Sequence, residues 1–529
     1  MVRPASLLLL LAGMISAPVL AREAVYASPP DALSVTVYRD PYRGPDQKLD
    51  RNWPRGFAMI SETRTVTLPP GEATIRFDGV AEGMVAVSAI VTGLPGGTIE
   101  KNRNAELLSP GALVDGSLGN RVTITRTNPG TGVETSEDAI VRTRGDGGLV
   151  LQTANGFEAV RCSGLAENLT FDRVPAGLSA NPVYSVDTRT AGGGTFNVTL
   201  TYLAWGFDWQ ANYVATLADP STGDDLAMRL TSWLTLVNDN GQGFPDAELM
   251  AVAGKLKVVS NYQALSEPPA GKPLELLCYP LGSTAKGSAD DVPPPFPPPP
   301  PPPPPPAPVA MEAQAIMVTG SRMRAPAMVA RQEDLADMKL YRVPEPVDLA
   351  AKSQKQVAFL DRQGVTGRLI YTTECAPWSG GDEARPASII LATVNDEKHG
   401  LGVALPNGRL TVLEGSQRGD QLVGSRSLRD YASGQDIEID LGQSAQVFAR
   451  CAVQNPDSVD NPGAPARMHL TLSNANSAPA VVRIVLGSTG DGVISGIRGL
   501  RVKDGARIIE IDVPASATRE LRWIYTVSD

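Results

Sequence analysis

The sequence predicts an all-β protein made of antiparallel β-sandwich domains and interrupted by a polyproline linker or insert. Of its 529 residues, 51 are glycine and 45 are proline, which favours short elements joined by turns over long helices. Runs of alternating apolar and polar residues recur between these turn residues, as they do in sandwiches and barrels. A hydrophobic fraction of 42% is sufficient for packed cores.

The N-terminus has the pattern of a secretory signal peptide. Arg3 precedes an apolar stretch from Leu7 to Ile15, and Ala21 ends a run with the small residues that signal peptidase prefers. This stretch is too short to cross a membrane as a helix, which needs about 20 residues. We therefore expect residues 1–21 to be removed and the mature chain, without a transmembrane segment, to be periplasmic or secreted.

Strands are expected along the whole mature chain, because each run is rich in alternating or β-branched residues and ends at Gly, Pro or Asn. Before the proline-rich region the expected strands are 34–38, 62–68, 73–77, 85–91, 120–127, 148–153 and 201–213. After it they are 355–360, 365–373, 389–393, 409–413, 435–440, 445–451, 468–472, 481–486, 508–511 and 520–527. The last part includes a strand, polar turn and strand at 468–486, a pattern typical of immunoglobulin-like sandwiches.

Residues 293–308 are almost all proline. Proline has a fixed φ and no N–H to donate, so this run favours a polyproline II spacer over helix or sheet. A ligand for a proline-binding partner is the alternative. The expected organisation is an N-terminal β-domain (22–150), a first part of a second β-domain (151–292), a proline-rich segment (293–335) and the second part of that domain (336–529).

Four cysteines, Cys162, Cys278, Cys375 and Cys451, are candidates for disulfide bonds. An even number in an exported chain suggests two bridges, and three connectivities are possible. We favour Cys162–Cys278 and Cys375–Cys451, because each pair then lies on one side of the prolines. Buried free thiols are the alternative.

An aromatic strand at 201–213 is the strongest single strand signal. Its alternation puts the rings of Trp205 and Trp209 on one face and polar groups such as Asp208 and Asn212 on the other. We expect the aromatic face to be core, because burial of aromatic rings dominates core energetics. The alternative is a ligand face, in which the rings stack on a carbohydrate or peptide and the polar groups donate or accept hydrogen bonds.

Several segments resemble the bacterial domain-of-unknown-function 4139 family, which is described as mucoidy-inhibitor-like. They are YLAWGFDWQANYVATL at 202–217, WLTLVNDNGQGFPDAELMAVAG at 233–254, LYRVPEPVDLAAKSQKQVAFL at 340–360, HGLGVALPNGRLTVL at 399–413 and DVPASATRELRWIYTV at 512–527. ISETRTVTLPPGEATIRFDGV at 60–80 resembles the β-domain that accompanies the family. The coiled coil common between the two domains is absent, and the prolines interrupt the C-terminal one. The resemblance implies an envelope β-protein and brings no catalytic residues, since the family has no established activity.

The sequence shows no catalytic motif. It lacks the nucleophile elbow, zinc-helix, phosphate-loop and dinucleotide patterns. Neither of its two histidines, His399 and His469, belongs to such a motif. We therefore expect no catalytic, cofactor-binding or metal residues, no cofactor and no enzyme activity. A net charge of −10 disfavours nucleic acid as a partner.

These observations favour an exported, envelope-associated β-protein that acts as a structural, binding or interaction module. Its partner would be another envelope protein or a glycan. The alternative is an enzyme that acts on envelope polysaccharide through paired carboxylates, which are distant in sequence in such enzymes and leave no local motif.

Export predicts a defined N-terminus. Because signal peptidase cleaves after Ala21, the mature chain is expected to begin at Arg22. Intact-mass measurement and N-terminal sequencing of the protein from the periplasmic fraction test this. Recovery of a chain that begins at Met1 from the cytoplasm would contradict it.

Overall fold

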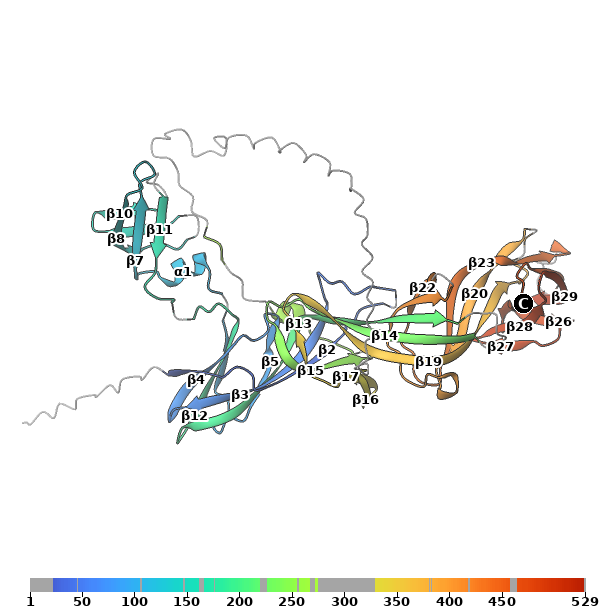
Figure 1. The fold of residues 1–529 in the computed structure, drawn as a ribbon, viewed down its shortest axis with the longest axis horizontal. Coiled ribbons are helices and arrows are strands. Elements are labelled where there is room, and N and C mark those ends of the chain that lie inside the picture. The colour runs from blue at the N-terminus through green and yellow to red at the C-terminus, as the bar shows by residue number, and fades with distance from the viewer. Residues whose placement is uncertain are drawn as a thin grey trace, which may run out of the picture. The chain divides into compact units, whose positions relative to one another are not determined.

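The computed structural model describes residues 22–527 with gaps. The gaps are residues 45, 105–106, 146–147, 161–165, 176, 219–225, 255, 267–271, 275–328, 380, 382, 417–418 and 457–463. The predicted signal peptide, the prolines, Cys162 and Cys278 therefore lie outside the described residues. The structure is 61% strand and 4% helix, which confirms the all-β prediction (Figure 1).

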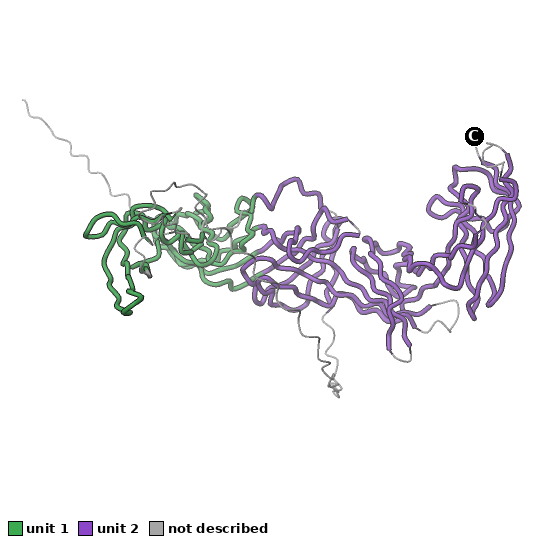
Figure 2. The backbone as a smooth tube through the Cα atoms, turned by 90° about the horizontal axis from the view of Figure 1, so that it is seen from above, with its two compact units in different colours: residues 1–33, 61–202, 265–317 green, residues 34–60, 203–264, 318–529 purple. Residues whose placement is uncertain are grey.

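The chain forms two compact units (Figure 2). Unit 1 comprises residues 1–33, 61–202 and 265–317, and unit 2 comprises residues 34–60, 203–264 and 318–529. This division differs from the consecutive segments that composition suggests. The reason is that strand pairing joins residues far apart in sequence, whereas composition marks only linkers.

Two sheets lie wholly within unit 1. In the first, of order β1-β4-β12-β6, the strands are β1 (Glu23–Tyr26), β4 (Gly71–Asp78), β12 (Val183–Thr190) and β6 (Glu100–Arg103). In the second, of order β10-β9-β8-β7-β11, they are β10 (Gly156–Ala159), β9 (Val150–Thr153), β8 (Glu134–Val141), β7 (Arg121–Thr127) and β11 (Ala166–Thr170). Helix α1 (Pro110–Gly116) begins after Ser109, whose hydroxyl accepts a hydrogen bond from Ala112 N–H as an N-cap.

The core of unit 1 follows from alternation along its strands. On β4, Ile75 and Phe77 point inward and are fully buried. They stand opposite Val186 and Tyr184 of β12, which are equally buried. Such apolar cross-strand pairs stabilise a sheet. Strand β5 (Met84–Thr92) and the part of β3 (Gly56–Leu68) from Ser61 onward also belong to this unit.

In unit 2, strands that precede the prolines pair with strands that follow them. Those before are β2 (Ala32–Tyr38) from Ser34, β13 (Gly194–Leu217) from Leu203, β14 (Leu226–Asn238) and β15 (Phe244–Ala253). Helix α2 (Tyr262–Ser266) follows, and this stretch of unit 2 ends within it at Ala264. Those after are β16 (Arg331–Leu335), β17 (Met338–Arg342), β18 (Val347–Leu349), β21 (Gly408–Glu414) and β22 (Gln421–Leu428). β14 pairs with the first half of β19 (Ser353–Glu374), β13 pairs with β21, and β15 pairs with β17 and β18.

The C-terminal sheet of unit 2 is built from β19 onward. It contains the second half of β19, β20 (Arg385–Val394), β23 (Asp436–Val453), β24 (Pro465–Asn474), β25 (Ala480–Ser488), β26 (Gly492–Ser495), β27 (Arg501–Lys503), β28 (Ala506–Val513) and β29 (Ala517–Val527). A short 3-10 helix, η3 (Glu397–His399), follows β20. Met468 and Leu470 on β24 and Ile484 on β25 lie in one buried apolar core. β24 pairs with β23 and β29, whereas β25 pairs with β19 and β28. Side chains from two different sets of paired strands therefore meet in this core.

The sheets are mixed. Parallel pairs join β1 to β4, β13 to β21, β15 to β2 and β19 to β25, and the other strand registers that the structure describes are antiparallel. Parallel pairing requires a long crossover between the partners. Here the crossovers are long because the partners lie in distant parts of the chain. This feature leaves no local signal in the sequence.

The alternation along β13 changes phase at Gly206. Gly206 has a φ of +87°, a conformation that favours glycine. Before it Ala204 is buried and Trp205 is partly exposed, whereas after it Phe207 and Trp209 are buried. The expectation that Trp205 and Trp209 share one face is therefore wrong, because one glycine shifts the two-residue period.

The strand pairing across residues 275–328 predicts that the chain stays together when it is cut there. Cleavage within residues 293–328 is expected to leave two fragments that elute as one species in size-exclusion chromatography. Backbone hydrogen bonds and buried side chains of the pairs β14–β19 and β13–β21 hold the fragments together. Separation of the fragments without denaturant would contradict this.

Candidate ligand-binding groove

An open, charged groove of about 340 Å³ lies on the C-terminal sheet of unit 2. Its charged side chains come from five strands, and His399 of η3 also lines it. The charged side chains are Arg368 of β19, Asp436 and Glu438 of β23, Arg483 of β25, Arg501 and Lys503 of β27, and Glu510 of β28. On β23 and β25, alternation along the strand points Glu438 and Arg483 into the groove and their apolar neighbours into the core. Glu438, for example, lies between the buried residues Ile437 and Ile439.

Glu510 accepts hydrogen bonds from three arginines. Arg368 donates to both of its carboxylate oxygens, at 3.2 and 3.3 Å. Arg483 is the cross-strand neighbour of Glu510, and its Nε lies 3.1 Å from Oε1. Arg501 Nη2 lies 2.9 Å from Oε2. Charge-assisted hydrogen bonds of this kind are stronger than neutral ones, so the three guanidinium groups are held in defined positions.

A second carboxylate extends the network. Glu438 receives two hydrogen bonds from Arg483 Nη1, at 2.9 and 2.8 Å. Lys503 Nζ lies 3.2 Å from Glu438 and 2.8 Å from Asp436. Arg483 is nearly buried, with 8% of its side chain exposed, and both of its carboxylate partners are in place. A buried charge is tolerated when it is paired in this way.

The electrostatics of the groove favour the ionised forms of Glu510 and Lys503. Burial raises the pKa of Glu510, but the hydrogen bonds from Arg368, Arg501 and Arg483 outweigh it, so this pKa lies below its ordinary value. The hydrogen bond to Asp436 raises the pKa of Lys503, burial opposes that rise, and Glu438 adds to it. Glu510 and Lys503 are therefore charged at neutral pH.

Basic groups outnumber acidic ones in this groove. Its lining contains four Lys or Arg side chains and three Asp or Glu side chains, whereas the whole chain has a net charge of −10. Arg501 is 58% exposed and Arg368 is 46% exposed. Glu510 is the partner of Arg501 among the described residues, and a guanidinium group has five N–H donors. The exposed arginines can therefore bind an anionic group that enters the groove.

His399 lies at one end of the groove. Its ring Nδ1 is 2.6 Å from Asp396 Oδ1, and its backbone N–H donates to the same oxygen at 2.9 Å. The hydrogen bonds from His399 lower the pKa of Asp396. The other histidine, His469, lies 3.2 Å from Glu520 on neighbouring strands and does not line the groove.

The aromatic strand is not a ligand face. Trp209 is fully buried, and its indole N–H donates to the carbonyl of Val252 at 3.2 Å. Asp208 is buried and paired with Arg43, and burial raises its pKa to about 6 against the opposing effect of Arg43. The possible ligand role of Trp209 and Asp208 is therefore wrong, because both lie in the interior of unit 2.

The other two residues of that proposed face have structural contacts as well. Trp205 is partly exposed, and its carbonyl accepts a hydrogen bond from Asn240 at 3.1 Å. Asn212 is also partly exposed, and its amide donates to Thr235 at 2.7 Å. The structure thus does not bring the four residues together on one accessible surface.

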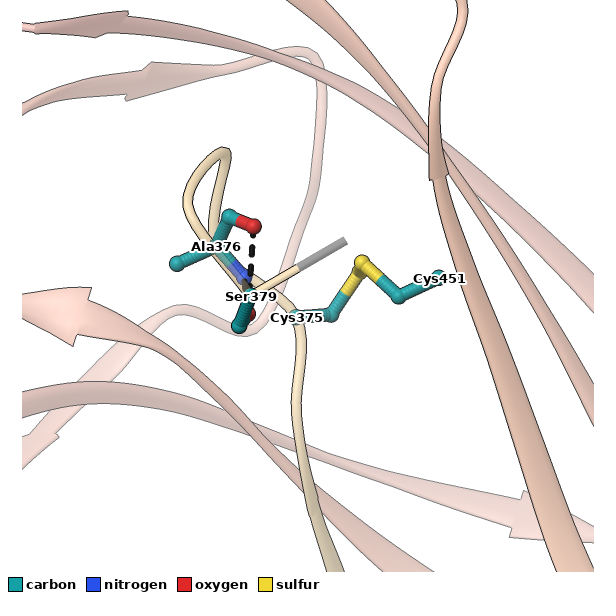
Figure 3. Close-up of a disulfide and its surroundings, with 4 residues drawn as sticks. All are labelled: Cys375, Ala376, Ser379 and Cys451. Carbon is teal, nitrogen blue, oxygen red and sulfur yellow. Dashed lines mark hydrogen bonds between the residues drawn. A yellow bond between two sulfur atoms is a disulfide. The ribbon is translucent and has the colours of Figure 1, made fainter. Parts of the chain in front are cut away.

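One predicted disulfide is confirmed. Cys375 and Cys451 are bonded, with their Cα atoms 5.5 Å apart (Figure 3). This bridge joins the end of β19 to β23 within unit 2. The predicted pair Cys162–Cys278 falls outside the described residues.

The groove residues are absent from the sequence-based expectations. They are single charges on separate strands, and no spacing along the chain connects them. A signal did exist: Glu438 lies between two isoleucines at 437 and 439, and Glu510 lies between two isoleucines at 509 and 511. Charged side chains on strands are usually exposed to solvent, so the sequence gives no reason to assign these residues to one site.

No protein-family model matches the chain, and no curated protein matches it significantly.

Among the described residues, no three or more His, Cys, Asp or Glu side chains are placed to hold a metal ion. The described helices include none with the length and apolar character that crossing a bilayer requires.

The network around Glu510 predicts a pH-dependent loss of stability in Glu510→Gln. At pH 7 this variant is expected to lose about 1–3 kcal/mol of unfolding free energy, because three arginines lose a charged acceptor. The folded-state pKa of Glu510 is lowered, so its contribution is present above the unfolded value of about 4.3 and lost as pH falls through the folded value.

Urea unfolding of wild type and variant between pH 7 and pH 3 measures this difference. The gap between the two proteins should narrow below about pH 4.3. Asp512→Asn is a matched control, since Asp512 is exposed on the same strand. A gap that stays constant with pH would contradict the account.

Proposed function

We propose that this protein is an exported binding module of the bacterial cell envelope, and that it holds an anionic ligand in the groove around Glu510. The observation that carries the proposal is the set of three arginines on one carboxylate, two of them exposed. An arginine fork matches the geometry of a carboxylate or phosphate. Among envelope components, the acidic polysaccharides present such carboxylates repeatedly.

The location in the envelope is supported by two features. The first residues have the pattern of a signal peptide, and unit 2 contains a disulfide bond, which persists in oxidising compartments. The resemblance to the domain-of-unknown-function 4139 family agrees with an envelope role. Membership of that family is part of the proposal and rests on the segments quoted above.

The geometry favours binding over chemistry. The three carboxylates of the groove are each paired with Lys or Arg, and the strongest network holds Glu510 ionised. A glycosidase acid has a raised pKa, so that it carries a proton to the leaving group. Glu510 has the opposite shift. An enzyme that acts on envelope polysaccharide is the alternative, and the assay below separates it from a binding module.

Binding of polygalacturonate, a polymer of uronic-acid carboxylates, tests the proposal. Isothermal titration is expected to show saturable binding, and Arg501→Ala is expected to weaken it about 10- to 100-fold through the loss of charge-assisted hydrogen bonds. Raising the ionic strength from 0.05 to 0.5 M should weaken it further, because salt screens exposed charges. Arg519→Ala is the matched control, since Arg519 is exposed on β29 and does not line the groove.

Equal affinity of wild type, Arg501→Ala and Arg519→Ala would overturn the groove as the binding site, and so would an absence of binding. Reducing-end measurements on the same samples separate the two classes of function. A binding module leaves the polymer length unchanged, whereas release of new reducing ends would establish the enzyme.

A further inference from the structure

A second feature of unit 2 is an exposed tryptophan on a turn with a buried base. The indole of Trp378 is 51% exposed, whereas Cys375 and Ala376 just before it are fully buried. Pro377 is buried as well. This turn consists of residues 375–379, directly after β19. It therefore presents one large ring to solvent from an anchored backbone.

The turn is fixed by covalent and hydrogen bonds (Figure 3). Cys375 is joined to Cys451 of β23. Ser379 N–H donates to the carbonyl of Ala376 at 3.0 Å, and Ser379 Oγ accepts from Ala376 N–H at 2.7 Å. A ligand that contacts this turn loses little free energy in ordering it, because the turn is already in place.

The ring of Trp378 is also oriented. It packs edge-to-face against buried Tyr525, with centroids 5.6 Å apart and planes at 85°. A Cβ at position 487 would lie 3.5 Å from Trp378 Cη2 and 2.9 Å from the Tyr525 hydroxyl, so Gly487 leaves room for both rings. One part of the indole is thus packed on the protein, and the rest remains open to solvent.

A polar cleft of about 640 Å³ begins beside this turn. Ser379, the neighbour of Trp378, lines it, and so does Val485, which is two residues from Gly487. The polar side chains that line the cleft include Glu374, Glu383, Arg385 and Gln443. Its size is that of a small-molecule or oligosaccharide site.

We propose that Trp378 and this cleft bind an uncharged oligosaccharide. The C–H groups on one face of a pyranose ring pack on the electron-rich face of an indole. Hydroxyl groups of the next sugars donate to the carboxylates of Glu374 and Glu383 and accept from Arg385 and the amide of Gln443. The acidic groups outnumber the basic one, so an uncharged sugar fits better than the anionic ligand of the Glu510 groove.

This site does not depend on the proposed function of the groove. The two sites have different linings, and no residue lines both. They also differ in the charge of the ligand that they favour. Each can therefore be removed without the other.

Titration of the full chain with cellotetraose, maltotetraose and chitotetraose tests the proposal, with tryptophan fluorescence as the readout. At least one of the three is expected to bind and to change the fluorescence. Trp378→Ala is expected to lower that affinity at least 10-fold, and Glu383→Gln to lower it as well. Trp53→Ala is the matched control, because Trp53 has a similar exposure of 55% but lies between β2 and β3 and belongs neither to the 375–379 turn nor to the lining of the cleft.

Two further variants keep the test decisive. Trp378→Phe retains an aromatic ring and is expected to keep part of the affinity, with a melting curve like that of wild type. Arg501→Ala is expected to bind the neutral sugar as wild type does, which separates this site from the groove. Absence of binding by all three sugars would overturn the proposal, and so would binding that is unchanged in Trp378→Ala.

Discussion

The pairing of strands from opposite sides of the proline-rich region is the constraint on which unit 2 depends. β14 pairs with β19 over most of its length, and β13 pairs with β21 in parallel. β19 then continues into the C-terminal sheet, where it pairs with β20 and β25. One long strand thereby links the sheet that spans the prolines to the sheet that carries the groove and the cleft.

The sequence predicted the fold class well because alternation and turn residues are local signals. Strands such as 73–77 and 481–486 were expected and are found as β4 and β25. The sequence did not predict which strands pair with each other, since pairing between distant strands leaves no local pattern. Gly206 shows the limit at one residue: its positive φ shifts the period of β13, and an alternation count alone cannot detect this.

The candidate sites differ in how visible they are in the sequence. Cys375 and Cys451 could be paired by their positions, because both follow the prolines. The Glu510 groove could not be found, since its charges lie on separate strands and meet only after folding. The aromatic strand shows the opposite case. Its rings form an obvious pattern in the sequence, but Trp209 is buried in the core and is not available to a ligand.

The central claim is that the Glu510 groove binds an anionic ligand, and hydrogen exchange tests it most directly. Exchange of the full chain is measured by mass spectrometry with and without polygalacturonate. The account predicts slower exchange confined to the segments that line the groove, namely those around Arg368, Glu438 and Arg501–Glu510. Unchanged exchange in these segments at saturating polymer, or protection only elsewhere in the described chain, would contradict it.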